Sequence, residues 1–397
     1  MGLPLLLLLL TAARAEPGPE LLVNGGFEQG GALPTAWHLV PGATVPGSGH
    51  SRVKRVREQD GNAVVRLTGA AGTARWDSLD SDPVPVTPGT LLELRGRMRT
   101  EGVRVEGHQY ANCDLALMFT DAQGAVVRVG GSPVVATPVL RGDQPWAALD
   151  RVVTVPPGAT TVTVLAFLSM SGTSWVDDLS LRIASPPDWV RAETKHYLFL
   201  SSQPAPVSAQ DQARNEEIYA RMSATLGVDL PFKVTYHRYA TPAEKGAWTG
   251  DAGNGHAQGD RDLYTVWPID DHEIVHLLAR QWGETDSPLL GEGLAVALSG
   301  SWLGRPPDAW VAELKAQGKV PDLASLVDGA RFRSMDDRVS YALAGSFVDF
   351  FIQLWGIDRF HLVYTGTDPL PARLQRETGM DLDQLRAAWL EGLGEAP

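Results

Sequence analysis

Two histidines and two glutamates of this chain could together hold a metal ion and activate water. His272, Glu273 and His276 form the pattern H-E-x-x-H, and Glu292 follows with 15 residues between it and His276. Residues four apart lie on one face of an α-helix, so both imidazoles can reach one zinc ion at about 2.0–2.1 Å. Glu273 is rotated by about 100° from His272, which puts its carboxylate beside the metal. The pattern predicts a zinc site with His272, His276 and Glu292 as ligands and Glu273 as the general base.

The residues around this pattern predict the elements that must position it. The apolar residues 274–278 predict a helix, with Asp270 as its N-cap. Gly283 and the Asp-Ser-Pro sequence at 286–288 predict the end of that helix and the start of the next, which carries Glu292. Helices joined by so short a connection pack side by side, so Glu292 can face the histidines.

Two other interpretations of the pattern stay open. Asp270 and Glu273 could form a capping box on a half-exposed helix whose histidines bind nothing. The residues could also be the relic of a metal site that has lost its activity.

The order H-E-x-x-H, a turn and E-G-x-A (residues 292–295) resembles the gluzincin metallopeptidases, in particular the peptidase MA-like domains. The resemblance implies an α+β zincin-like fold, zinc on two histidines and one glutamate, and hydrolysis of peptide bonds. It implies that Tyr341 donates a hydrogen bond to the oxyanion; a tyrosine packed at a helix start is the alternative. The spacing before Glu292 is shorter than in the thermolysin-like and aminopeptidase branches. Val296 stands where the thermolysin-like branch keeps an aspartate.

Several other residues near the pattern have two interpretations each. His256 is a second electrophile or a surface-loop histidine. Asp271 orients an imidazole, or is a first-turn acid favoured by the helix dipole. A strand predicted at 263–266 would, by the same resemblance, border the cleft and pair with an extended peptide. Three tryptophans could line subsites or pack in the core: Trp248, Trp267 and Trp282.

The beginning of the chain resembles a secretory signal peptide. An apolar run at residues 5–10 precedes Ala13-Arg14-Ala15, which matches the small-x-small cleavage pattern. The run is too short to span a bilayer, and no other long apolar stretch exists. We therefore predict a signal peptide at 1–15 and a mature protein without a membrane span, in the extracellular space or the periplasm.

Composition narrows the classes of partner. The 397 residues are enough for two domains with their own cores. A formal net charge of −13 argues against nucleic acid as a partner. The single cysteine, Cys113, excludes an internal disulfide and is predicted to be a small buried residue of a strand.

Residues 185–188 separate two patterns. Before them, short alternating runs are divided by glycine and proline; after them, apolar residues recur at helical spacing. The contrast predicts a multidomain chain, with an all-β jelly-roll sandwich at 16–186 and the α+β gluzincin-like domain at 187–397.

The first domain is similar to galactose-binding-like jelly rolls of the carbohydrate-binding-module type, on the motifs at residues 22–28, 86–89 and 175–181. The resemblance implies a structural Ca²⁺ where the first and last strands meet, with Glu28 and Asp178 as ligands. Turn-capping acids without a metal are the alternative. It also implies carbohydrate as a partner, bound by exposed aromatic rings, although such rings are often core residues. The candidates are Trp76, Tyr110 and Trp146.

Together these features predict a secreted zinc peptidase, acting on protein, peptide or glycoprotein substrates and targeted or supported by its β-sandwich. The alternative is a non-catalytic glycan-binding or cell-surface protein with a relic peptidase domain. A third interpretation is hydrolysis of a non-peptide amide or ester, because activated water attacks any suitable carbonyl.

Overall fold

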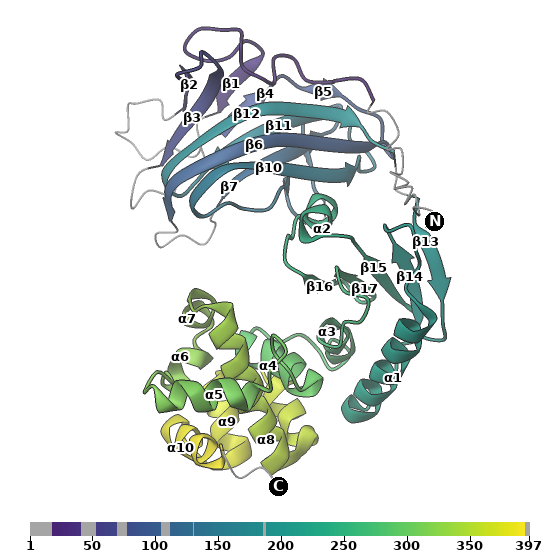
Figure 1. The fold of residues 1–397 in the computed structure, drawn as a ribbon, viewed down its shortest axis with the longest axis vertical. Helices are drawn as coiled ribbons and strands as arrows, with labels where there is room; N and C mark the ends of the chain where they lie inside the picture. Colours follow the sequence, from purple (N-terminus) through teal and green to yellow (C-terminus); the bar gives the residue numbers. More distant parts are fainter. Residues whose placement is uncertain are drawn as a thin grey trace, which may run out of the picture. The chain divides into compact units, whose positions relative to one another are not determined.

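The computed structural model describes residues 18–40, 53–69, 78–104, 112–129, 131–185 and 188–393. The chain forms two compact units, which Figure 1 labels by their elements. The first unit comprises Met1–Asp188 with Thr241–Gly253, and the second comprises Trp189–Ala240 with Asn254–Pro397. The predicted signal peptide lies outside the described residues. Within the described ranges, no helix combines the length and apolarity needed to cross a membrane.

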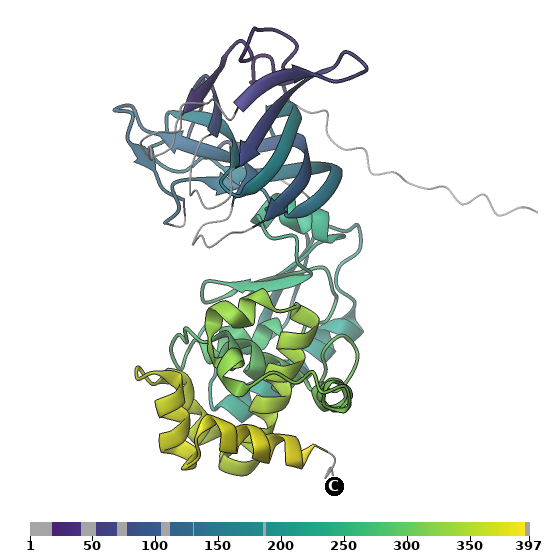
Figure 2. The same cartoon turned by 90° about the vertical axis from the view of Figure 1, so that its left-hand side faces the viewer.

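The described part of the first unit is a sandwich of two antiparallel sheets (Figures 1 and 2). One sheet has the order β1-β4-β11-β7-β8, with β5 on β11 and β9 on β7. Its strands are β1 (Trp37–Val40), β4 (Ser78–Ser81), β5 (Val84–Pro85), β7 (Cys113–Thr120), β8 (Val126–Val127), β9 (Val135–Ala136) and β11 (Thr161–Leu168). The other has the order β10-β6-β12-β3-β2. Its strands are β2 (Val53–Arg57), β3 (Ala63–Gly69), β6 (Leu91–Arg104), β10 (Gly142–Thr154) and β12 (Ser171–Ile183).

Alternation of apolar and polar residues explains the sandwich. Along β6, Leu92 and Leu94 are buried in the core, and Glu93 between them and Arg95 after them are only half-buried. Leu115 and Leu117 of β7 enter the same core from the other sheet. Period-2 alternation turns one face of each sheet toward this core. On the other face of the sheet that holds β7 and β11, Ala116, Leu165 and Phe167 form a smaller buried cluster. The N-terminal region is therefore mostly β, as predicted, and a later region is helical. Cys113 is buried in β7, also as predicted.

One short helix joins the first unit from far along the chain. Helix α2 (Pro242–Thr249) packs on β10. Arg151 of β10 donates hydrogen bonds to the carbonyls of Ala247 and Trp248 at the C-terminal end of α2, where a cation is favoured by the helix dipole. Residues 241–253 belong to the first unit, although the predicted domain boundary at 186–187 puts them in the second domain.

The second unit begins with a mixed sheet in the order β13-β14-β15-β17-β16. Its strands are β13 (Val190–Glu193), β14 (Tyr197–Ser201), β15 (Val234–Arg238), β16 (Gly255–Gln258) and β17 (Asp262–Thr265). The strand predicted at 263–266 is β17, but it lies inside the sheet, because a hairpin adds β16 to it. The edge that the sequence analysis placed at β17 therefore belongs to β16.

Helices make up the remainder of the described second unit. They are α1 (Ala209–Leu226), α3 (Glu273–Ala279), α4 (Pro288–Ser299), α5 (Pro307–Ala316), α6 (Leu323–Val327), α7 (Gly329–Ser334), α8 (Asp337–Thr365), α9 (Leu370–Thr378) and α10 (Leu382–Gly392). The predicted helix break after α3 is present, with Gly283 at φ 132°. Tyr341 is not at the start of its helix: α8 begins at Asp337, with Asp336 as its N-cap, and Tyr341 lies in its second turn.

A buried carboxylate of the sandwich makes the stability of the first unit depend on pH. Asp114 of β7 is fully buried. Its Oδ2 accepts a hydrogen bond of 2.9 Å from Asn112 Nδ2, and its Oδ1 has no partner within the described residues. Burial raises the pKa of Asp114 to about 7. Between the ordinary pKa of an aspartate and this value, the native state holds a proton that the unfolded chain has released.

We therefore expect the protein to lose stability as pH rises from about 4 to about 7, by up to about 4 kcal/mol from this group. An Asp114→Asn variant has no such proton to lose. Its melting temperature relative to the wild type should be higher at about pH 8 than at about pH 5. The control is Asp188→Asn, which changes an exposed aspartate. A difference between wild type and Asp114→Asn that stays the same at both pH values would contradict the expectation.

Candidate metal centre

The three predicted zinc ligands converge in the second unit. The Nε2 atoms of His272 and His276 lie 3.2 Å apart. Glu292 Oε2 lies 3.3 Å from Nε2 of His272 and 3.4 Å from Nε2 of His276. A tetrahedral zinc ion with ordinary bond lengths requires ligand atoms about 3.3–3.4 Å apart. The triangle has the dimensions of one face of that tetrahedron, so these residues fit zinc. Among the described residues, they form the one group of three or more His, Cys, Asp or Glu close enough to hold a metal.

Gly293 allows α4 to lie close to α8, in the position from which Glu292 reaches the histidines. A Cβ atom on Gly293 would lie 2.5 Å from Val348 Cγ2 and 2.8 Å from the carbonyl oxygen of Ala344, both on α8. Any larger residue would therefore push α4 away from α8. Gly293 thus has a steric role in the E-G-x-A sequence, and it fixes the helix position from which the neighbouring Glu292 reaches the histidines.

Asp270 holds the turn that leads into α3. Its Oδ1 accepts hydrogen bonds from the backbone N–H of His272, at 3.3 Å, and of Glu273, at 3.0 Å. The predicted N-cap at Asp270 is therefore wrong, because α3 begins at Glu273 with His272 at its N-cap position. Capping alone does not explain why three ligand atoms converge. The two hydrogen bonds from Asp270 instead hold the turn that carries His272 and Glu273.

Burial and charge set the protonation of the two glutamates. Burial raises the pKa of the Glu273 carboxyl, while the charges of His276 and His272 act against that rise. Burial would also raise the pKa of Glu292, but its hydrogen bonds and charge interactions with the two histidines outweigh burial and lower this pKa. Glu292 is thus ionised, as a metal ligand must be, and Glu273 has a greater affinity for a proton than an exposed glutamate.

Tyr341 and Trp302 form an aromatic wall beside His272. The ring of Tyr341 stacks on that of Trp302 with centroids 4.7 Å apart. His272 lies 6.3 Å from Tyr341 and 5.8 Å from Trp302, measured between ring centroids. Burial, and then the negative charge of Glu292, raise the pKa of Tyr341, so its hydroxyl keeps its proton at neutral pH. Trp302 is a residue of this site that the sequence patterns do not reveal. Its position two residues after Gly300, which ends α4, is the one feature that could have pointed to it.

The other polar candidates do not join the ligand group. His256 lies in β16, and its ring stacks on Tyr264 with centroids 5.0 Å apart. Nδ1 of His272 is buried without a hydrogen-bond partner in the described part of the chain, so Asp271 does not orient that imidazole. Val296, at the place where the thermolysin-like branch has an aspartate, is buried against α8.

A cavity of about 450 Å³ opens beside the centre. His276, Glu292 and Tyr341 form its inner wall, and Arg280 and Arg333 are among the charged residues around it. Of the three tryptophans proposed near the site, Trp282 packs on His361 with centroids 4.4 Å apart. Trp267 is exposed, and Trp248 belongs to α2 of the first unit.

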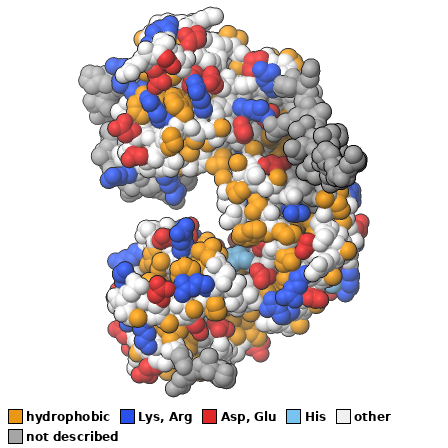
Figure 3. All heavy atoms as spheres, in the orientation of Figure 1, with side chains coloured by type: hydrophobic (Ala, Val, Ile, Leu, Met, Phe, Trp, Pro, Cys, Tyr) orange, Lys and Arg blue, Asp and Glu red, His pale blue; other side chains and the backbone are white. Residues whose placement is uncertain are grey.

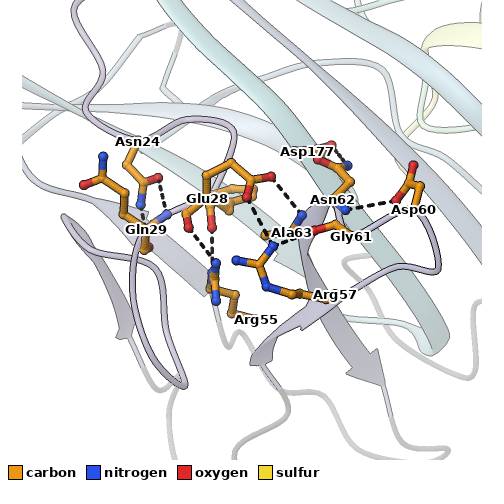
Figure 4. Close-up of polar contacts among 11 residues, drawn as sticks. Asn24, Glu28, Gln29, Arg55, Arg57, Asp60, Gly61, Asn62, Ala63 and Asp177 are labelled. Carbon is orange, nitrogen blue, oxygen red and sulfur yellow. Dashed lines mark hydrogen bonds and ion pairs between the residues drawn. The ribbon is translucent and has the colours of Figure 1, made fainter.

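The predicted calcium ligands are paired with arginines. Glu28 accepts a hydrogen bond of 2.9 Å from the N–H of Ala63 and faces Arg57 at 3.4 Å (Figure 4). Arg55 donates to the backbone oxygen of Glu28 at 2.7 Å. Asp178 sits at a bulge of β12 and pairs with Arg97 Nε at 2.8 Å. Guanidinium groups thus supply the positive charge at both carboxylates, and this geometry lends the calcium prediction no support.

The structure describes one of the three aromatic residues predicted to bind sugar. Trp76 and Tyr110 lie outside the described residues. Trp146, on β10, is half-buried and lies beneath the guanidinium groups of Arg97 and Arg99, 4.9 and 5.4 Å from its ring centroid.

Comparison with known proteins gives similarities for the N-terminal region. No family model and no curated protein matches the sequence. The structure of the CBM22-1 xylan-binding domain from Paenibacillus barcinonensis Xyn10C is similar, with 18% identity and a TM-score of 0.29 over 43% of this chain and 99% of that one. TmCBM61 in complex with β-1,4-galactotriose has 19% identity and a TM-score of 0.27 over 41% of this chain and 97% of that one. The active domain of bacteriophage CBA120 tailspike protein 4 has 17% identity and a TM-score of 0.30, but only 21% of it is covered, against 41% of this chain. The carbohydrate-binding modules align with the mostly-β N-terminal part.

We expect the purified protein to bind about one zinc ion per chain. A His276→Ala variant should bind zinc at least about 100-fold more weakly, because loss of a direct ligand costs more than loss of an outer partner. The Glu273→Gln variant should keep its zinc, since the Glu273 carboxylate is not one of the three converging ligand groups. The measurement is elemental analysis after dialysis against a weak chelator. His361→Ala, which changes a histidine packed on Trp282, is the control; equal zinc retention by His276→Ala and this control would contradict the ligand assignment.

Proposed function

We propose that the second unit is a zinc-dependent peptidase of an exported protein. The observation that supports this most is the triangle of His272, His276 and Glu292, whose 3.2–3.4 Å sides match the coordination shell of zinc. Zinc, when bound, supplies a Lewis acid that polarises a carbonyl group and makes water more acidic.

Glu273 is the general base of this proposal. It lies next in sequence to a ligand, and only 9% of its surface is exposed. It takes a proton from the attacking water as the new C–O bond forms on the scissile carbonyl carbon. It then gives that proton to the leaving nitrogen as the C–N bond breaks. A raised pKa suits both steps, because the carboxylate must hold the proton between them.

Tyr341 is the hydrogen-bond donor of this proposal. Its hydroxyl keeps its proton at neutral pH, and its ring is fixed against Trp302. A donor aimed at the developing oxyanion stabilises the transition state more than the substrate.

The edge strand favours a peptide as the substrate over another amide or an ester. β16 pairs with β17 on one side and ends the described sheet on the other. A Cβ atom on Gly255 of β16 would lie within 3.1–3.2 Å of side-chain atoms of Glu273. The edge therefore runs directly against the general base. An extended peptide added to this edge would pass its carbonyl groups close to Glu273.

We expect the zinc-loaded protein to cleave an unstructured protein such as casein, and a chelator to stop the cleavage. Glu273→Gln should lower kcat by about 10²–10⁴-fold and Tyr341→Phe by about 10²–10³-fold, both with zinc retained. The measurement is kcat with a quenched fluorescent peptide, alongside zinc content. A Glu273→Gln variant with full activity would remove the general-base role. Bound zinc without cleavage of any protein tested would favour the glycan-binding protein with a relic site.

We propose a second function, glycan binding by the first unit. The observation that favours it is a pair of half-exposed tryptophans, Trp146 and Trp175, on the outer face of the sheet β10-β6-β12-β3-β2. Arg99 lies between them, 5.4 and 4.2 Å from their ring centroids. Figure 3 shows apolar, basic and acidic side chains interleaved over this part of the unit. Aromatic rings can stack on pyranose faces, and ion-paired side chains can hydrogen-bond to hydroxyl groups.

We expect the full chain, made inactive by Glu273→Gln, to bind polysaccharides on a glycan array. Adding Trp146→Ala should weaken this binding by about tenfold, the value of one aromatic stacking contact. Val139→Ala, which changes an exposed apolar residue of the same unit, should leave it unchanged. Equal binding by the Trp146→Ala and Val139→Ala proteins would show that this face is not the glycan site.

A further inference from the structure

A tight turn beside the metal centre has an unusual residue at its tip. Trp302 and Arg305 are joined by two backbone hydrogen bonds, of 2.8 and 3.1 Å, which close a two-residue turn. Leu303 and Gly304 at its centre have φ values of 51° and 76°. Two successive residues with positive φ belong to a type I′ turn, which prefers asparagine, aspartate or glycine at the position that leucine holds here.

The turn is firmly anchored next to the proposed catalytic groups. The backbone oxygen of Trp302 accepts a hydrogen bond of 3.1 Å from Trp310 Nε1. The guanidinium of Arg305 lies 4.4 Å from the ring centroid of Trp310 and pairs with Glu313 at 3.1 Å. These contacts hold the Trp302 ring against Tyr341 and His272.

Leucine at position 303 has two unfavourable features. Its backbone is in the left-handed region, which a leucine enters at a cost in strain. Its side chain is 53% exposed and is not part of the apolar core of the second unit. Strained residues that persist near a site are a reason to look for function there. An exposed apolar group next in sequence to Trp302, whose ring lies beside His272, is suited to contact an apolar part of a ligand.

The turn and the cavity adjoin different histidines. The cavity is lined by His276 but not by His272, whereas the Trp302 ring lies beside His272. Tyr341 contacts both regions. A peptide that places its scissile carbonyl at the ligand triangle would therefore extend toward the polar cavity in one direction and toward the turn in the other.

We propose that the turn at residues 302–305 is an apolar subsite, in which Trp302 and Leu303 select peptides with a bulky apolar side chain beside the scissile bond. This inference rests on the proposed peptidase function and names its substrate class. Trp302 provides the wall of the subsite and Leu303 its rim. Apolar area that the substrate covers in the transition state raises kcat/KM for leucine or phenylalanine over alanine.

The test uses the full zinc-loaded protein and a series of peptides that differ at one residue next to the cleaved bond. For the wild type we expect kcat/KM to be at least about tenfold higher with phenylalanine or leucine than with alanine. Trp302→Ala and Leu303→Gly should remove most of this preference by weakening cleavage of the bulky peptides. Trp302→Phe, which keeps an aromatic wall, should retain it. Leu354→Ala, which changes a similarly exposed leucine of α8, should behave as the wild type does.

The Leu303→Gly variant also distinguishes a change in substrate selectivity from a loss of protein stability. Glycine adopts positive φ without strain, so the melting temperature of this variant should equal or exceed that of the wild type. If Leu303→Gly and Trp302→Ala keep the wild-type preference for bulky peptides, the subsite proposal is overturned. If Glu273→Gln still inactivates the enzyme in that case, the peptidase proposal stays intact. Failure of the zinc-loaded wild type to cleave any peptide would overturn both.

Discussion

The close packing of α4 against α8 is the contact on which the rest of the second unit depends. Each helix contributes a glycine at the crossing. A Cβ on Gly293 would overlap α8, and a Cβ on Gly345 would lie 2.2 Å from Val296 Cγ1 of α4. Because both side chains are absent, the backbones approach closely, and buried apolar residues such as Leu294 and Val348 fill the remaining space. This packing places Glu292 on one helix opposite Tyr341 on the other.

The carboxylates of the two units have different partners. In the sandwich, Glu28 and Asp178 each face an arginine, and Asp177 is fully buried yet accepts a hydrogen bond of 2.8 Å from Arg97. In the second unit, Glu292 faces two imidazoles, and no ion pair with lysine or arginine is found for it in the described part of the chain. A carboxylate and two imidazoles that direct lone pairs at one point leave a place for a cation. This contrast is the physical reason for proposing a metal in the second unit and none at Glu28.

Local sequence patterns predicted what depends on local physics. The spacing of His272 and His276 follows from one helical turn, and the break at Gly283 follows from backbone freedom, so both could be read before the fold was known. The position of Glu292 was a reasonable inference from a short connection. What the sequence did not reveal depends on tertiary contacts. The docking of α2 through Arg151, the hairpin that moves the sheet edge to β16, and the placement of Trp302 against Tyr341 leave no periodic signal in the chain.

We propose that His272, His276 and Glu292 hold one zinc ion. Anomalous diffraction on either side of the zinc absorption edge, from crystals of the full chain grown without added metal, tests it directly. We expect a single strong zinc peak about 2.0–2.2 Å from Nε2 of both histidines and from a carboxylate oxygen of Glu292. A peak elsewhere in the second unit, or an ordered triangle with no anomalous signal after zinc is added, would contradict it.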